Sequence, residues 1–140
     1  MNVLIDSNIV IDVLIKREPF VERSQLVLFA SEGKRICGYV SAAAVTDIFY
    51  ITNKYIKDRT VTYELVKNYF LRMVNIAAVD ANTITQALDV AWNDFEDCVQ
   101  YIVGEAIHAD YIVTRNPKDF LRGSIAAVSP QELLDMIAPE

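Results

Sequence analysis

Four aspartates occur in separate segments of the chain, at positions from which their carboxylates could be brought together. They are Asp6, Asp47, Asp97 and Asp119. Carboxylate oxygens are the hard ligands that Mg²⁺ and Mn²⁺ prefer, and these ions keep bound waters that can become nucleophiles. In two-metal sites the ions lie about 4 Å apart and hold the attacking and leaving oxygens of a phosphodiester. If these side chains converge, the chemistry that they fit is metal-dependent hydrolysis.

The positions of the acids relative to the expected strands favour convergence. Asp6 directly follows the apolar run 1–5, and Asp119 lies just beyond the run 111–113. Asp97 falls in the first turn of the helix before that run, and Asp47 about two turns into another helix. In open parallel sheets, ligands bind outside the carboxyl ends of the strands. We therefore expect these acids at one end of a sheet.

Each acid also has a structural interpretation. Asp6 could merely cap the first helix, Asp47 could lie on a solvated helix face, and Asp119 could be a turn residue. Asp94 and Asp97 are three residues apart, which is also the spacing of an N-terminal capping pair. We expect Asp94 to be the cap and Asp97 the functional group. We expect four other acids to be surface or ion-pair residues: Asp12, Glu18, Glu22 and Glu96.

The scarcity of other catalytic side chains leaves the chemistry to carboxylates. The chain has one histidine, His108, so a zinc site and a Ser-His or Cys-His pair are both disfavoured. Cys37 and Cys98 are far apart and lack a Cys-x-x-Cys pattern, so we expect them to be buried, reduced side chains.

Composition indicates one ordinary folded domain covering residues 1–140. Hydrophobic residues make up 53% of the chain, which is ample for a core. The formal net charge of −6 is unlike that of a protein that coats nucleic acid, although a carboxylate pocket loaded with cations would offset it. The sequence shows neither a membrane span nor a signal peptide, so we expect a cytoplasmic protein without a membrane partner.

Short β-rich runs alternate with helical stretches along the whole chain. Strands are expected over 1–5, 36–40, 76–79, 111–113 and 125–128, and helices over 7–15, 19–33, 42–56, 60–73, 82–92, 95–108 and 131–137. The expected helix caps are Ser7, Ser41, Asn82, Asp94 and Ser129. This alternation predicts an α/β fold with a mainly parallel central sheet.

Four segments in order resemble the PIN domain family, in particular its VapC-like toxin branch. They are the opening Val-Leu-Ile-Asp6-Ser-Asn, the middle Ser41-Ala-Ala-Ala-Val-Thr-Asp47, the later Asp94-Phe-Glu-Asp97 and the closing Thr114-Arg-Asn-Pro-Lys-Asp119-Phe. Each motif is short, but the ordered set spans nearly the whole chain.

The resemblance implies a three-layer α/β/α fold and Mg²⁺- or Mn²⁺-dependent endoribonuclease activity on RNA. It carries over Asp6 and Asp97 as the principal metal ligands, with Asp47 as a further acid, and it implies that Thr114 and Asn116 line the same pocket. It also implies a toxin that acts as a homodimer and is silenced by a small antitoxin protein. We expect Arg115 or Lys118 to help hold the scissile phosphate, although Arg115 could equally be a solvated turn residue.

Two positions depart from the family pattern. The second acid is usually Glu but is Asp47 here, and a position that is often Asp in relatives is Asn116. Asp119 could take the fourth acidic position, or the site could hold one metal. These departures leave open a PIN-fold RNA-binding module that no longer cleaves.

A third interpretation is a receiver-like phosphoacceptor domain, because Asp80 and Thr114 follow expected strands. Such domains need paired acids after the first strand, where this chain has Asp6-Ser7, and a lysine after the fifth, where it has Ser129.

Overall fold

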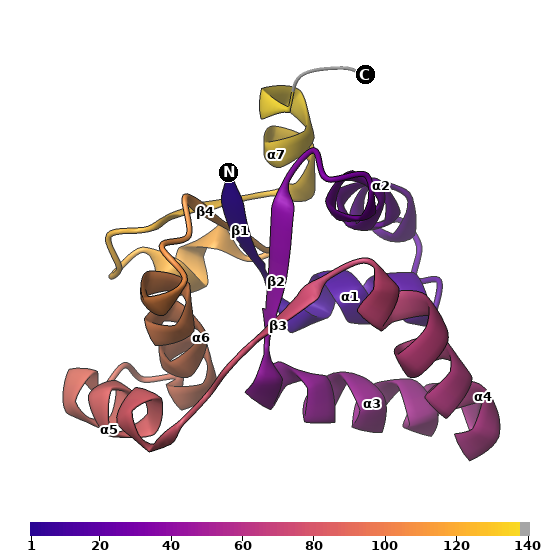
Figure 1. The fold of residues 1–140 in the computed structure, drawn as a ribbon, viewed down its shortest axis with the longest axis horizontal. Helices are drawn as coiled ribbons and strands as arrows, with labels where there is room; N and C mark the ends of the chain where they lie inside the picture. The colour runs from indigo at the N-terminus through magenta and orange to yellow at the C-terminus, as the bar shows by residue number, and fades with distance from the viewer. Residues whose placement is uncertain (138–140) are drawn as a thin grey trace.

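The computed structural model describes residues 1–137, which form a five-stranded sheet with helices on both faces (Figure 1). The strands are β1 (Asn2–Ile5), β2 (Cys37–Ser41), β3 (Asn75–Ala77), β4 (Tyr111–Val113) and β5 (Ala126–Val128). Their order across the sheet is β3-β2-β1-β4-β5, and every neighbouring pair is parallel. The predicted α/β fold with a parallel sheet is confirmed.

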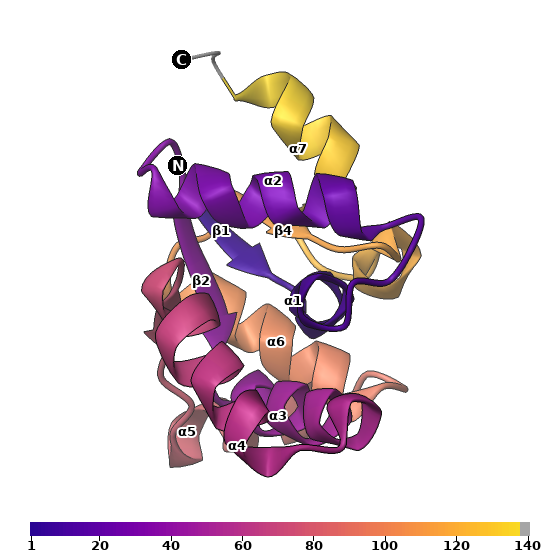
Figure 2. The same ribbon diagram turned by 90° about the vertical axis from the view of Figure 1, so that its right-hand side faces the viewer.

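Seven α-helices surround this sheet within the described residues. They are α1 (Ser7–Leu14), α2 (Val21–Glu32), α3 (Ala42–Ile56), α4 (Arg59–Glu64), α5 (Ala81–Val90), α6 (Phe95–Ala106) and α7 (Pro130–Met136). Helices α5 and α6 cover one face of the sheet, α1 and α2 lie on the other, and α7 packs over α2 (Figures 1 and 2). The chain is thus a three-layer α/β/α structure. No helix within residues 1–137 is long and apolar enough to cross a bilayer.

The central strand β1 explains how the two faces are held together. Val3, Leu4 and Ile5 are all completely buried. Alternate side chains of a strand point to opposite faces, so Val3 and Ile5 join the core beneath α1 and α2 while Leu4 joins the core beneath α6. A strand covered on both faces needs a continuous apolar run, which is the pattern that predicted it.

Three of the five predicted helix caps are confirmed. The Ser41 hydroxyl accepts from the Ala43 amide, the Asp94 carboxylate accepts from the Asp97 amide, and Ser129 forms a reciprocal capping box with Glu132. In each case a short polar side chain precedes the helix and satisfies an amide that has no partner inside it.

The other two caps and one helix start were wrong. Ser7 is the first residue of α1, and Asp6 stands at the cap position without making a side-chain capping bond. Asp80, not Asn82, caps α5. Helix α2 begins at Val21, so Pro19 lies in the preceding turn rather than in the helix.

The strand order changes direction between β1 and β4. From β1 the chain moves to β2 and then β3 on one side, and it returns to add β4 and β5 on the other. Such a reversal opens a crevice at the carboxyl ends of the two central strands, where ligands of α/β proteins bind. Asp6 and Thr114 are the first residues after β1 and β4.

Candidate active site

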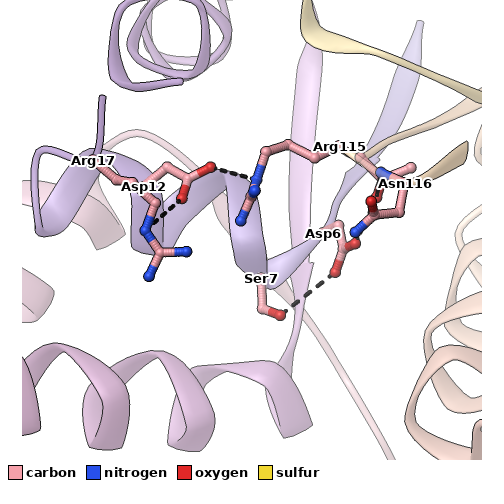
Figure 3. A network of polar contacts seen from close by, with 7 residues as sticks. Asp6, Ser7, Asp12, Arg17, Arg115 and Asn116 are labelled. Carbon is pink, nitrogen blue, oxygen red and sulfur yellow. Dashed lines mark hydrogen bonds and ion pairs between the residues drawn. The ribbon is translucent and has the colours of Figure 1, made fainter. Parts of the chain in front are cut away.

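Asp6 is held at this crevice by hydrogen bonds to both of its carboxylate oxygens. The Thr114 hydroxyl donates to Oδ2 at 2.7 Å, and the Gln100 side-chain amide donates to Oδ1 at 2.9 Å. The Ser7 hydroxyl lies 3.4 Å from Oδ1 (Figure 3). Asp6 is 5% exposed, so these neighbours fix its orientation. This use of the carboxylate explains why Asp6 does not cap α1.

Thr114 connects Asp6 to the loop that follows β4. Its side chain is fully buried, and its hydroxyl donates to Asp6 while accepting from the Asn116 amide at 3.0 Å. Asn116 lies beside Asp6 in Figure 3. Asp119 follows in the short 3₁₀ turn Pro117–Phe120 and is exposed. The position of Asp6 is therefore coupled to the conformation of this loop.

Gln100 is a site neighbour that the sequence interpretation missed. It is 3% exposed on α6, and its Oε1 has no hydrogen-bond partner among the described residues. Gln100 lies three residues after Asp97, so both side chains lie on one face of α6. An amide in an otherwise apolar helical run, at this spacing from a candidate acid, was the available signal.

Asp97 lies in the first turn of α6 and is half-buried. Burial raises the pKa of its carboxyl to about 7, and the carboxylates of Asp94, Asp6, Asp119 and Glu96 add to the rise. Burial disfavours the charged form, and nearby negative charges disfavour it further. Asp6 and Asp119, from two distant segments, therefore lie within electrostatic reach of Asp97.

Glu96 and Asp47 form a second acidic pair beside this group. Burial raises the pKa of Glu96 to about 7, and the charge of Asp47 and a hydrogen bond with it contribute next. A hydrogen bond between two carboxyls requires a proton on one of them. Glu96 as a whole is exposed, as expected of a surface residue, but its carboxyl is partly shielded from solvent and lies beside Asp47. Both side chains line a cavity of about 170 Å³ between α3 and α6.

The donor set suits a hard divalent cation, although the carboxylates do not form a closed ligand shell. Throughout the described part of the chain, no three His, Cys, Asp or Glu side chains stand together as ligands of one ion. Sites for Mg²⁺ or Mn²⁺ are built from oxygen donors. The carboxylates of such a site repel one another until a bound cation offsets their charge. Water ligands or side-chain rotation would complete the coordination.

Arg115 is placed away from the acids. Its Nε lies 2.7 Å from Oδ2 of Asp12 (Figure 3). Its guanidinium also lies over the Phe20 ring, 4.2 Å from the centroid. The Arg17 Nε is 3.7 Å from the other Asp12 oxygen. Asp12 is completely buried, and this burial raises its pKa despite the two arginines. Arg115 thus has a buried structural partner, and Lys118 is exposed.

Asp80 has a local structural role. Its Oδ1 accepts from the amide and the hydroxyl of Thr83, and these bonds lower the pKa of the Asp80 carboxyl. It follows β3, an edge strand separated from β1 by β2. This geometry gives no support to a receiver-like phosphoacceptor site.

A sequence-family model and two solved structures are similar to this chain. The model of the PIN domain family matches residues 2–118. The fold is similar to that of FitAB bound to an IR36 DNA fragment, with a TM-score of 0.68 and 17% identity over 91% of this chain and 94% of the other. It is similar to FitAcB from Neisseria gonorrhoeae at the same TM-score, with 18% identity over 92% and 98%. A search of curated proteins by sequence found no match.

Proposed function

Because the chain belongs to the PIN domain family, whose members are generally nucleases, we propose that it is a divalent-metal-dependent endoribonuclease. Residues 1–140 would act as one nuclease domain. The observation that carries the proposal is the group of acids around Asp97, whose pKa is raised chiefly by burial and further by nearby carboxylates, among them Asp6 and Asp119 from distant segments. Perturbed carboxyls in a crevice are typical of sites that bind cations or transfer protons.

Asp6 and Asp97 would hold Mg²⁺ or Mn²⁺, assisted by Asp47, Glu96, Asp119 or Asn116. The bound ion would acidify a water to supply the nucleophile and would neutralise charge on the scissile phosphate. Thr114 and Gln100 keep the Asp6 carboxylate oriented toward the crevice. Asn116 brings an amide oxygen to the same side and adds no negative charge that would repel the phosphate.

We further propose that the enzyme is the toxin of a type II toxin–antitoxin pair, is a homodimer and is blocked by a small antitoxin protein. The motif resemblance and the similarity to FitAB and FitAcB support this proposal. The target RNA would be cytoplasmic.

The direct test measures cleavage of single-stranded RNA by the wild type and by Asp6→Asn and Asp97→Asn variants with Mn²⁺. We expect both variants to lose at least about 100-fold in rate, since each removes a charged ligand. EDTA should stop the wild type. Asp89→Asn, an exposed acid on α5, is the matched control and should cleave normally. Equal rates for Asp6→Asn and the wild type would refute the assignment.

A second candidate function is a PIN-fold module that binds RNA without cleaving it. The shorter acid at Asp47 and the uncharged Asn116 favour it, because the Asp47 carboxylate reaches less far toward an ion and the Asn116 amide brings no negative charge. Measuring RNA binding and RNA turnover in the same Mn²⁺ buffer separates the two functions. Tight binding without turnover would favour the module.

A further inference from the structure

A cavity of about 340 Å³ lies between the start of α2 and the start of α7, next to the loop after β4. Its lining includes the rings of Pro19, Phe20 and Pro130 and the arginines Arg23 and Arg115. Its volume falls within the range of roughly 300–1,000 Å³ that is typical of sites for small organic groups. None of the acids described above lines it.

The cavity combines an aromatic face with cationic groups. Phe20 is 37% exposed, and the Arg115 guanidinium lies over its ring. The contact of Arg115 with Asp12 uses Nε, so the Nη atoms of a side chain that is 22% exposed are available to an incoming group. Aromatic rings and arginine planes are the surfaces on which proteins stack unpaired RNA bases.

Arg23 gives the rim a positive charge. It is exposed, and its Nε donates to the Gln131 side-chain oxygen at 2.6 Å. No carboxylate within residues 1–137 forms an ion pair with Arg23. Its charge is therefore free to attract a phosphate, and the bond to Gln131 holds the guanidinium at the cavity.

Ser24 also lines the cavity. It is completely buried, and its hydroxyl has no hydrogen-bond partner in the described structure. The hydroxyl would reach a ligand only after its side chain rotates, and the free-energy cost of an unpaired buried hydroxyl favours such a rotation.

The cavity and the candidate active site are linked through consecutive residues of the loop after β4. Arg115 lines the cavity, and the preceding residue, Thr114, donates its hydroxyl to Asp6. Ser129, which follows β5, places the cavity at the same carboxyl edge of the sheet. A strand of RNA whose phosphate lies at Asp6 would bring an adjoining nucleotide to this cavity.

We propose that the cavity between α2 and α7 is a nucleotide-binding subsite, which takes an unpaired base of single-stranded RNA beside the scissile phosphate. The base stacks on the exposed surface of the Phe20–Arg115 pair, and Arg23 contacts its phosphate. This inference rests on the proposed ribonuclease function. It explains how an acidic protein can bind RNA: the positive contacts are concentrated beside the metal site rather than spread over a basic face.

The test compares Arg23→Gln and Phe20→Leu with a matched control, Arg59→Gln, which removes an exposed arginine from α4. Steady-state cleavage of single-stranded RNA should show KM raised about 5-fold or more for the first two variants, with kcat little changed, and no effect in the control. Thermal denaturation should confirm that all variants are folded. Unchanged KM for both cavity variants, with an active wild type, would overturn the subsite and leave the nuclease intact.

Crosslinking locates the RNA independently of cleavage. Single-stranded RNA carrying 4-thiouridine, irradiated with the wild type in EDTA, should label the tryptic peptide 18–23, which contains Phe20. The label should fall sharply in Phe20→Leu and persist in Arg59→Gln. If the wild type does not cleave RNA but labels this peptide, the nuclease proposal fails and the subsite stands. Absence of the label, or loss of binding only to a partner protein in the cavity variants, would overturn the subsite.

Discussion

Arg115 and Asp12 form an ion pair across the boundary between the β4 loop and α1, with Nε 2.7 Å from Oδ2. The Asp12 carboxylate is completely buried, and its oxygens make no well-aligned hydrogen bond within the described chain. The pair therefore compensates a charge that burial disfavours, and it joins the loop that carries Thr114 and Asn116 to the helix that follows Asp6.

Arg115→Met should destabilise the protein by about 3 kcal/mol at pH 7, because it leaves Asp12 buried without its main partner. Burial already raises the pKa of Asp12 above its ordinary value. A carboxyl with a raised folded-state pKa is protonated in both states at low pH, and its ionisation removes stability as pH rises. The loss should therefore be larger at pH 8 than at pH 4 in urea denaturation.

The double variant Asp12→Leu/Arg115→Met is the control for this pair. Replacing both charges with apolar groups of similar size should recover most of the lost stability. Arg122→Met, at an exposed arginine in the same region of the chain, should have no effect. If the double variant were as unstable as the sum of its parts, the two residues would not be coupled.

Asp97→Asn should stabilise the metal-free protein at neutral pH. The pKa of Asp97 is raised to about 7, chiefly by burial and then by neighbouring carboxylates. Between the ordinary value of 3.8 and about 7, the folded state keeps a proton that the unfolded state has lost, so stability falls as pH rises through this window. The melting temperature of the variant should exceed that of the wild type at pH 8 and equal it below pH 4.

Mn²⁺ should reverse the order of the melting temperatures of Asp97→Asn and the wild type. Binding to the native state stabilises the wild type by about 2.7 kcal/mol at a hundredfold excess over the dissociation constant. Asp97→Asn should lose this gain, while Asp89→Asn should retain it. A melting temperature of Asp97→Asn that rose with Mn²⁺ as much as that of the wild type would rule Asp97 out as a ligand.

Thr114→Val should lower RNA cleavage by about 10–100-fold, because the Asp6 carboxylate loses the donor that orients it. Valine has nearly the same shape, so the fold should lose only about 1 kcal/mol. Thr114→Ser keeps the hydroxyl and should retain most of the activity. Equal cleavage by the valine and serine variants would show that this hydrogen bond does not support the reaction.

Asp47→Glu should raise the cleavage rate several-fold. The longer side chain supplies the acid usual in the family, and it extends into the cavity that Asp47 and Glu96 already line. Asp47→Asn is the counterpart and should lower the rate. A lower rate in both variants would mean that the shorter acid is already fitted to this site.

The sequence was sufficient to predict the features that depend on local pattern. The buried run Val3–Ile5 can only suit a strand covered on both faces, and Ser41 and Ser129 directly precede apolar helical stretches. Ser7 is not the cap of α1, because Asp6 occupies the position before the helix. The Asp6 carboxylate does not cap the helix either, because it accepts a hydrogen bond from the Thr114 hydroxyl. The residues around Asp6 in the sequence give no sign of this distant partner, Thr114.

The parts of the site that were missed depend on tertiary contacts. Asp12 was expected at the surface or in an ion pair; it forms an ion pair but is completely buried, and its partner Arg115 lies 103 positions away in the sequence. Gln100 reaches Asp6 over a separation of 94 residues. Burial, and after it the charge of Asp47 on another helix, raise the pKa of Glu96. A single sequence shows which residue types are present, but it does not show which distant residues contact one another.

The bond from Thr114 to Asp6 spans 108 residues and has a consequence for protein synthesis. Asp6 is synthesised long before Thr114, so its carboxylate has no orienting hydroxyl until the segment with β4 has been translated. A nascent chain that stops before β4 also lacks one of the two central neighbours of the sheet at this site. Under the proposed function, such a chain would be inactive, which would delay activity until β4 has folded beside β1.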